Sequence, residues 1–417
     1  MKTRKILIPT LILIAFIFSA AGPYPIDGYE ESGIRRLRYL QLVMEGSIKD
    51  TKPISGARLS ISDIKLNLVN EHNLEGIPNS DAALQKSISG LFAGLDPQYS
   101  VSVLDISPGK EIRYASRKEK SQYQPGSVGK LCVMAGFFTE IQKIYPQSFA
   151  KRQELMRSRK VMAGKWAMTD SHTVPFFDPE TKTFKKRTLI ESDVFSLYEW
   201  LDHMLSVSNN GAASVVWRET ILMRAFGKDY PSLTQAQADE YFKSTPKATL
   251  SELANQVVNQ PLRKLDISED EWRLGALFTR GAGSYIPGKG GSTGTTQGVM
   301  KFLIKMESGQ IVDGESSLEM KRLMYMTDRR IRYGTAAALA DAAVYFKSGS
   351  LYQCREEEGY SCGKYKGNVT NYMNSVAIIE HQDGSKYMVV LMSNVLKKNS
   401  ASDHASLAAS IDKIIRK

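Results

Sequence analysis

The pattern of hydrophobic and polar positions marks five short stretches as expected strands, two in the first third of the chain and three near its end. Residues 99–104 and 111–115 show alternation of such positions on either side of a Ser-Pro-Gly-Lys turn. Residues 343–347, 375–379 and 387–392 are short, mostly apolar runs, and an Asp-Gly turn precedes the last of them. Both a period of two and short apolar runs are typical of strands, so the pattern predicts a five-stranded sheet.

Helical periodicity frames and separates these strands. Residues 82–95 and 403–416 have the apolar spacing of helices, before the first strand and after the last. Between the second and third strands, a largely helical stretch with long polar loops runs to about residue 340. This order predicts an α+β fold, in which an antiparallel sheet is flanked by terminal helices and carries an inserted all-helical subdomain at about 118–340.

The first residues have the layout of a secretory signal. Basic residues precede an apolar run from Ile6 to Phe18, and the small residues Ser19, Ala20 and Ala21 follow. The run is short for a membrane span, although an uncleaved anchor is the alternative. We expect residues 1–21 to be a signal peptide and the protein to be secreted or periplasmic in a bacterium.

Residues 22–80 are expected to form an N-terminal extension, and residues 81–417 the main domain. The extension contains a basic segment with helical periodicity at 34–43. Such a segment either lies on a membrane surface or docks on its own protein, and docking is the more frequent case. Peripheral contact with a membrane or the cell wall through this extension stays open.

Composition narrows the function. Of the 417 residues, 42% are hydrophobic and 24% are charged, which is enough to build a sizeable core. The net charge of +11 is spread along the chain, and no basic cluster is interleaved with aromatic residues, so nucleic acid is not expected as a partner. The five histidines are scattered without metal-ligand spacing, so neither a metal nor another cofactor is expected. We expect a monomer.

The three cysteines have two different settings. Cys354 and Cys362 bracket a hairpin-like loop and could pair in an oxidising compartment. Cys132 falls among the apolar positions of a helix and is expected to be a buried small hydrophobic residue.

Ser127 is the first candidate for chemistry. It follows a Pro-Gly turn and precedes an apolar helical stretch, with Lys130 three positions further on. Positions three apart share a helix face, so the hydroxyl and the amine can meet. A desolvated lysine is able to accept the proton that makes serine a nucleophile. Alone, this spacing is weak evidence, because an exposed helix face produces it by chance.

Two further motifs lie downstream. Ser208, Asn209 and Asn210 follow a helical stretch at 197–204 and can present a hydroxyl and a carboxamide to one cavity, although Ser and Asn also cap helices. The run Lys347-Ser348-Gly349-Ser350 ends a predicted strand with a cation, a hydroxyl and a glycine that permits close approach. A strand end followed by a turn is the simpler alternative for the Lys347–Ser350 motif. The joint order of the three motifs favours a catalytic interpretation.

In that order, the motifs resemble the signature of the penicillin-recognising serine hydrolases, which include class A β-lactamases and DD-peptidases. That signature is Ser-x-x-Lys, then Ser-Asp-Asn, then Lys-Thr/Ser-Gly at the edge of a strand. The resemblance covers about residue 81 to the C-terminus and implies a β-lactamase-like fold. It also implies a substrate that is a small-molecule β-lactam or a peptidoglycan peptide.

The resemblance implies a role for each matched residue. Ser127 would be the acylated nucleophile, Lys130 the base and Ser208 a proton shuttle to the leaving nitrogen. The backbone amides of Ser127 and Ser350 would form the oxyanion hole. In full, the catalytic set is Ser127, Lys130, Ser208 and Lys347, and the substrate-binding set is Asn210, Ser348, Gly349 and Ser350.

Two departures from the family pattern bear on the reaction. Asn209 stands where class A enzymes usually have Asp. The Glu-x-x-Leu-Asn pattern, whose glutamate activates the deacylating water, is absent between Ser208 and Lys347, and Glu252 lies in the nearest match with the wrong spacing. We expect an exported serine hydrolase of class A β-lactamase type. The alternatives are a cell-wall DD-peptidase or esterase with slow deacylation, and a non-catalytic envelope binding protein.

Overall fold

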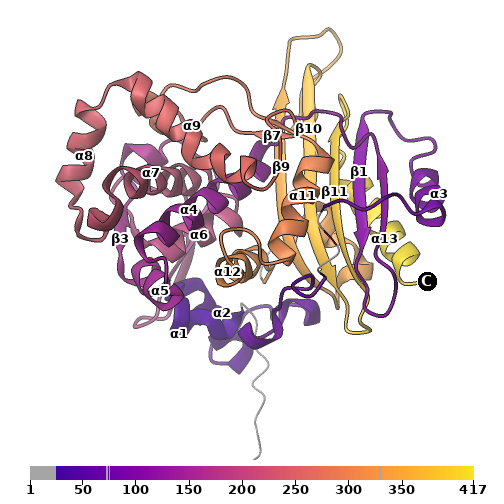
Figure 1. The fold of residues 1–417 in the computed structure, drawn as a ribbon, viewed down its shortest axis with the longest axis horizontal. Coiled ribbons are helices and arrows are strands. Elements are labelled where there is room, and N and C mark those ends of the chain that lie inside the picture. The colour runs from indigo at the N-terminus through magenta and orange to yellow at the C-terminus, as the bar shows by residue number, and fades with distance from the viewer. Residues whose placement is uncertain (1–24, 72–73, 75, 328–329) are drawn as a thin grey trace, which may run out of the picture.

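The structure is a computed structural model that describes residues 25–71, 74, 76–327 and 330–417. The expected signal peptide, residues 1–21, lies outside the described residues. Figure 1 shows a sheet on one side of the molecule and a cluster of helices on the other.

A five-stranded antiparallel sheet forms one half of the protein, in the order β2-β1-β11-β10-β9. Each of the five predicted stretches overlaps one of these strands, which confirms the predicted α+β fold. Four strands extend beyond the predicted stretch, and β2 has the predicted length but lies two residues further along the chain. Their bounds are Tyr99–Asp105 (β1), Arg113–Arg117 (β2), Ala343–Gln353 (β9), Thr370–Glu380 (β10) and Lys386–Asn394 (β11).

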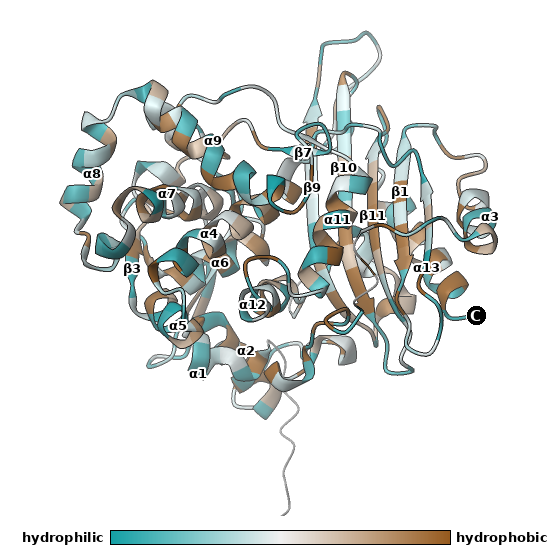
Figure 2. Ribbon diagram, viewed as in Figure 1, coloured by the Kyte–Doolittle hydropathy of each residue, from teal (hydrophilic) through white to brown (hydrophobic). Residues whose placement is uncertain are grey.

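Helices cover both faces of the sheet. Along β10, Val376 and Ile378 point into the core shared with the helical half, and Ala377 and Ile379 point to the opposite face. That opposite face is covered by α3 (Ala82–Gly90) and α13 (Ala401–Ile415), as expected for terminal helices. Figure 2 shows the strands as the most continuously hydrophobic part of the molecule.

The helical half surrounds α4 (Lys130–Ile144), whose side chains are almost all buried. It packs most closely on α7 and α9, and α11 and α12 lie between this half and the sheet. The remaining helices are α5 (Phe149–Ser158), α6 (Leu197–Leu205), α7 (Asn210–Phe226), α8 (Gln235–Ser244), α9 (Lys247–Arg263), α10 (Arg280–Tyr285), α11 (Thr296–Glu307) and α12 (Gly314–Met324).

The prediction of an all-helical insert needs correction, because three two-stranded sheets lie within it. Their strands have two to five residues, too few for a period of two to stand out in the sequence. The pairs are β3 (Lys160–Met162) with β6 (Val194–Ser196), β4 (Val174–Asp178) with β5 (Thr183–Arg187), and β7 (Trp272–Arg273) with β8 (Thr293–Gly294). Single 3₁₀ turns are η1 (Ile26–Gly28), η2 (Ser55–Ala57), η3 (Ile61–Asp63), η4 (Gly126–Gly129), η5 (Lys165–Ala167), η6 (Gly227–Ser232), η7 (Arg332–Thr335) and η8 (Ala337–Leu339).

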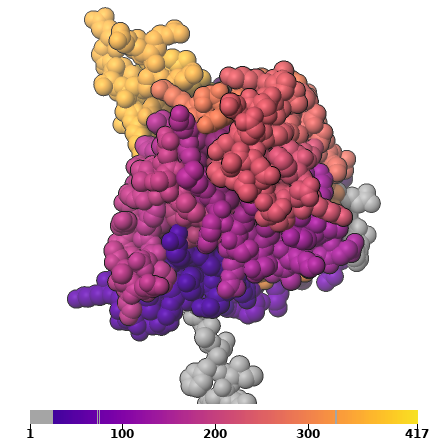
Figure 3. All heavy atoms as spheres, turned by 90° about the vertical axis from the view of Figure 1, so that its left-hand side faces the viewer, coloured from indigo at the N-terminus to yellow at the C-terminus, as the bar shows by residue number. Residues whose placement is uncertain are grey.

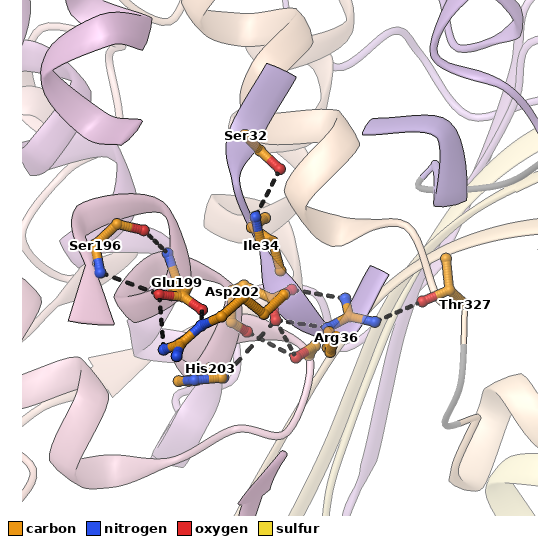
Figure 4. Close-up of polar contacts among 10 residues, drawn as sticks. Ser32, Ile34, Arg36, Ser196, Glu199, Asp202, His203 and Thr327 are labelled. Atoms are coloured by element: carbon orange, nitrogen blue, oxygen red, sulfur yellow. Dashed lines mark hydrogen bonds and ion pairs between the residues drawn. The ribbon is translucent and has the colours of Figure 1, made fainter. Parts of the chain in front are cut away.

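The N-terminal extension docks on the helical half through α1 (Tyr29–Ser32) and α2 (Arg35–Glu45). The Arg36 guanidinium donates two hydrogen bonds of 2.6 Å to the Asp202 carboxylate, and both side chains are buried (Figure 4). Leu37 is fully buried in the main core. The basic amphipathic segment therefore packs on its own protein. Within the described ranges, no helix is both long enough and apolar enough to cross a membrane.

The connection between β9 and β10 projects from the body of the molecule as a hairpin (Figures 1 and 3). A disulfide joins Cys354 to Cys362 within it. Cys132, by contrast, is a free thiol that is buried on α4.

Candidate active site

Ser127 lies in the 3₁₀ turn η4, immediately before α4. The turn is built on Gly126, whose φ of +52° favours glycine. A Cβ atom on Gly126 would lie 2.8 Å from the backbone nitrogen of Ser350, so β9 approaches the turn at backbone distance. Gly349 likewise packs against the backbone of Pro125 and leaves no room for a side chain. The serine is therefore held against the end of the Lys347–Ser350 segment.

A second strand fixes the same turn. The Asn374 side chain on β10 donates to the carbonyl oxygens of Gln124 (2.9 Å) and Pro125 (3.1 Å). Because Asn374 is fully buried and lies opposite Gly349 in the β9–β10 register, it ties the turn that carries Ser127 to an inner strand of the sheet. Sequence analysis missed this residue, since nothing near it in the chain marks it.

Lys130 is the centre of the polar network. Its Nζ donates to Ser127 Oγ (3.0 Å), to the Ser208 carbonyl oxygen (2.6 Å) and to Asn210 Oδ1 (2.8 Å). The side chain is fully buried, and this burial lowers the pKa of Lys130 to about 7, although the nearby charge of Asp170 raises it. The amine is therefore able to accept a proton near neutral pH.

Ser208 lies between two amines. Its φ of +58° is in the left-handed region, which is unusual for serine. In this conformation its hydroxyl accepts from Lys347 Nζ (2.7 Å) and from Lys130 Nζ (3.3 Å). Burial holds the pKa of Lys347 well below its ordinary value, and the positive charges of Lys130 and Arg332 add to the effect. A hydroxyl between two such amines can relay a proton.

The Asn209 side chain caps α7 and also binds the segment that carries His172. Its Oδ1 accepts from the Ala212 backbone nitrogen at the start of α7 (2.7 Å), and its Nδ2 donates to the His172 carbonyl (2.9 Å). The side chain is fully buried with both ends bonded. An uncharged amide therefore makes the hydrogen bonds that this position requires, where the family pattern has Asp.

Asp170 and His172 are site residues that sequence analysis missed. The Asp170 carboxylate accepts from the Asn210 backbone nitrogen (2.6 Å) and from Asn210 Nδ2 (3.3 Å), and it bonds His172 Nδ1 at 2.7 Å. Burial raises the pKa of Asp170, but the His172 and Asn210 bonds more than offset this and hold it below its ordinary value. The two residues precede Ser208 by more than 30 positions, so no local pattern links them to it.

The remaining predicted binding residues follow Lys347 along β9. Ser348 is nearly buried, and its carbonyl accepts from Lys347 Nζ (3.0 Å); Ser350 is partly exposed. Arg332 donates to the Gly349 carbonyl (2.7 Å) and supports this strand end. Ser127, Ser208 and Asn210 are also partly exposed, so a substrate has access to them. All the residues of the three motifs thus meet in one place, and their catalytic roles stay a prediction.

The loop after α9 brings an aromatic ring to Lys130. The Phe278 ring centroid is 5.2 Å from Lys130 Nζ. Thr279 fixes the loop beside it by donating to the Trp166 carbonyl (2.6 Å). Glu252 is an exposed residue of α9 that pairs with Lys289. No group of three or more metal-binding side chains is gathered in the part of the chain that the structure describes.

Comparison with known proteins adds a family and a fold. Residues 83–416 match the model of the beta-lactamase enzyme family. The fold is similar to that of the TLA-1 extended spectrum beta-lactamase, with a TM-score of 0.52, 15% identity and coverage of 81% of this chain and 100% of that one. No protein with a curated description matches the sequence significantly.

Two further structures are similar at the same level. A beta-lactamase from Chitinophaga pinensis has a TM-score of 0.51 and 14% identity, covering 80% of this chain and 98% of that one. A mutant of PBP-A, solved as an acyl-enzyme complex with penicillin G, has a TM-score of 0.51 and 9% identity, covering 82% and 99%. At these identities the likeness shows the fold alone.

Proposed function

The chain belongs to the beta-lactamase enzyme family, and on that premise we propose that it is a serine hydrolase that opens β-lactam rings through an ester at Ser127. One observation carries the proposal: Lys130 Nζ lies 3.0 Å from Ser127 Oγ, in a buried setting that lowers the pKa of the amine to about 7. A neutral amine at this distance is a suitable base for a serine nucleophile.

In the proposed acylation, Ser127 Oγ attacks the lactam carbonyl carbon while its proton passes to Lys130. The backbone amides of Ser127 and Ser350 stabilise the oxyanion, and such a donor typically contributes about 3–4 kcal/mol. As the carbon–nitrogen bond breaks, the Ser208 hydroxyl gives its proton to the ring nitrogen and receives one from an adjacent amine. The two amines that bond Ser208 support this relay.

Substrate binding is proposed to use the end of β9. A β-lactam or an acyl-D-Ala peptide carries a carboxylate, which Lys347 and the Ser348 hydroxyl would attract. Asn210 would donate from its carboxamide to the amide of the substrate. Arg332 keeps the strand end in place through the Gly349 carbonyl.

We also propose that the protein acts after export, as a monomer. The basic, apolar and small-residue order of the first 21 residues supports export, and so does the Cys354–Cys362 disulfide, because disulfides persist in oxidising compartments. Exposure to a periplasmic or extracellular β-lactam or peptidoglycan peptide would follow.

Intact-mass spectrometry after exposure to a penicillin tests the proposal. An adduct of one penicillin mass should form on the wild-type protein and then disappear as hydrolysed product accumulates. Ser127→Ala should form none. A folded wild-type protein that gains no adduct and hydrolyses no penicillin would contradict the proposal and leave a non-catalytic envelope binding protein.

A cell-wall DD-peptidase or esterase with slow deacylation is the second candidate. The observation that favours it is Phe278, because its ring faces Lys130 from a loop where a water-activating carboxylate would speed deacylation. In that case the adduct should last for many minutes, and the protein should release D-Ala from a muropeptide. A short-lived adduct would exclude it.

A further inference from the structure

We propose that Asp170 and His172 are positioning residues of this active site: Asp170 holds the Asn210 carboxamide and places a negative charge near Lys130, and His172 holds Asp170. The inference rests on the proposed function, because it concerns the same reaction at Ser127. It assigns a role to two residues that lie outside all three motifs.

The polarity of the bonds fixes the Asn210 amide. An ammonium group only donates hydrogen bonds and a carboxylate only accepts them. Asn210 lies between the two, with its Oδ1 accepting from Lys130 Nζ (2.8 Å) and its Nδ2 donating to Asp170 (3.3 Å). A second bond from the Asn210 backbone nitrogen to Asp170 (2.6 Å) locks the residue at the start of α7. Asp170 therefore decides which end of the amide faces the base.

Asp170 is itself held from the other side. Its carboxylate accepts from the His172 backbone nitrogen (3.2 Å) and bonds the His172 ring (2.7 Å), and only 4% of its side chain is exposed. The His172 carbonyl in turn accepts from Asn209 Nδ2 (2.9 Å). Two consecutive residues of the second motif thus bind the pair, because Asn209 binds His172 and Asn210 binds Asp170.

The backbone that carries the pair is also fixed. The Gly281 nitrogen at the start of α10 donates to the Met168 carbonyl (2.6 Å). Gly211 at the start of α7 packs so closely on Ala167 that a Cβ atom there would lie 2.6 Å from the Ala167 carbonyl oxygen. Two glycine contacts therefore hold the segment before Asp170 in one position, as precise placement of a catalytic neighbour requires.

The charges around Lys130 oppose one another. Burial disfavours a positive charge on Lys130, whereas Asp170 favours it. Lys347 on β9 shares the Ser208 hydroxyl with Lys130, and a positive charge on Lys130 disfavours one on Lys347. Asn210 and Ser208 are neutral, and the Phe278 ring presents its π face. Because acylation needs the neutral amine, removing the Asp170 charge should let Lys130 act as a base at lower pH.

The test is the pH dependence of the second-order rate constant for acylation by a fluorescent penicillin. Asp170→Asn keeps an acceptor for the Asn210 backbone and removes the negative charge. The acid limb of the profile, where the acylation rate constant rises with pH, should therefore move to lower pH by about one unit. Asp170→Ala removes both, so the rate constant should also fall roughly tenfold across the pH range. His172→Phe leaves the Asp170 carboxylate and its charge in place but removes the bond from the His172 ring. The acid limb should therefore stay at the same pH while the acylation rate constant falls several-fold.

Asp193→Asn is the matched control. Asp193 is another nearly buried aspartate of the same insert, and its bonds go to Arg187 and to the Ile190 backbone rather than to the site. It should leave the acid limb unmoved. Free energies of unfolding measured for all variants separate lost stability from lost positioning, because stability alone does not shift the limb.

The outcomes are distinct. If the wild-type protein is acylated and Asp170→Asn has the wild-type acid limb, the inference is overturned and the proposed function stands. If the wild-type protein is never acylated, the proposed function falls and takes the inference with it. Should Asp170→Asn fail to fold, His172→Phe still decides, because an unchanged rate constant there overturns the positioning role.

Discussion

At the residue scale, the site consists of side chains held in states that folding alone disfavours. Lys130 is an amine in the protein core, and Ser208 has a left-handed backbone. Each bond of the Lys130 amine goes to a group that the proposed reaction uses, namely Ser127, Ser208 or Asn210. A buried amine and a strained backbone that contact one another in this way are typical of functional sites rather than of ordinary hydrophobic cores.

Lys130 should make stability and activity depend on pH in the same range. Its pKa is about 7 in the folded protein and about 10.5 in the unfolded chain, so the unfolded chain binds more protons between these values. The free energy of unfolding should therefore rise with pH above 7, by up to about 1.4 kcal/mol per pH unit. The acylation rate should be half-maximal near pH 7. Lys130→Met should lower acylation about a thousandfold and reduce this stability slope, which urea unfolding at several pH values measures.

Phe278 offers a test of why an acyl-enzyme would persist. Phe278→Glu places a carboxylate beside Lys130, where it can accept a proton from water, and deacylation should speed up by about 100-fold or more. Phe278→Gln introduces a side chain of the same size as glutamate but without a carboxylate base, so it is the matched control. The lifetime of the penicillin adduct is the measurement. Equal lifetimes for the two variants would show that deacylation is limited elsewhere.

At the element scale, what could be predicted from the sequence depended on the range of the interactions. The strands of the large sheet and α13 were predictable because alternation, short apolar runs and helical spacing are all local patterns along the chain. Ser127 and Lys130 were predictable because one helical turn brings them together. Asp170 and Phe278 were not, since each meets the site through partners 40 or more positions away. The two-stranded sheets of the insert were missed for a different reason, because strands such as β3 and β7 are too short to display a period.

The helix α2 shows how the extension supports the site. Arg36 on α2 binds Asp202 on α6, and α6 ends just before Ser208 (Figure 4). Arg36→Met leaves a buried carboxylate without this partner and should lower the free energy of unfolding by about 3–5 kcal/mol. Adding Asp202→Leu should restore part of the loss, because no buried charge then remains unpaired. Urea unfolding at pH 7 tests both variants, and an effect of the single variant below about 1 kcal/mol would contradict a tightly coupled pair.

At the scale of the whole molecule, one hydrophobic core joins the extension to both halves. Ile34 and Leu37 of the extension belong to the same buried cluster as Met134 on α4 and Val376 on β10. The candidate active site lies where α4, α7 and β9 meet, so each of these parts adds to its rigidity. A substitution that changes the global stability should therefore affect the site even when the substituted residue lies far from Ser127.

Buried histidines should make the stability of the whole protein sensitive to acid. Burial lowers the pKa of His404 to about 3, and burial also lowers the pKa of His203. In the unfolded chain both have a pKa near 6.5, so below that pH the unfolded chain binds protons that the folded protein refuses. The stability is complete above pH 6.5 and declines as the pH falls towards 3. For His404 alone the loss between pH 7 and pH 5 should be about 2 kcal/mol.

His404→Gln isolates that contribution. Glutamine can bond the hydroxyls of Ser375 and Ser393, which His404 contacts at 2.9 and 3.4 Å, and it does not titrate. Urea unfolding of the wild-type protein and the variant at pH 5, 6 and 7 should give curves that converge as the pH falls, because only the wild type loses the His404 share. Parallel curves would mean that His404 takes up its proton in the folded state, and the acid sensitivity would then have to come from His203.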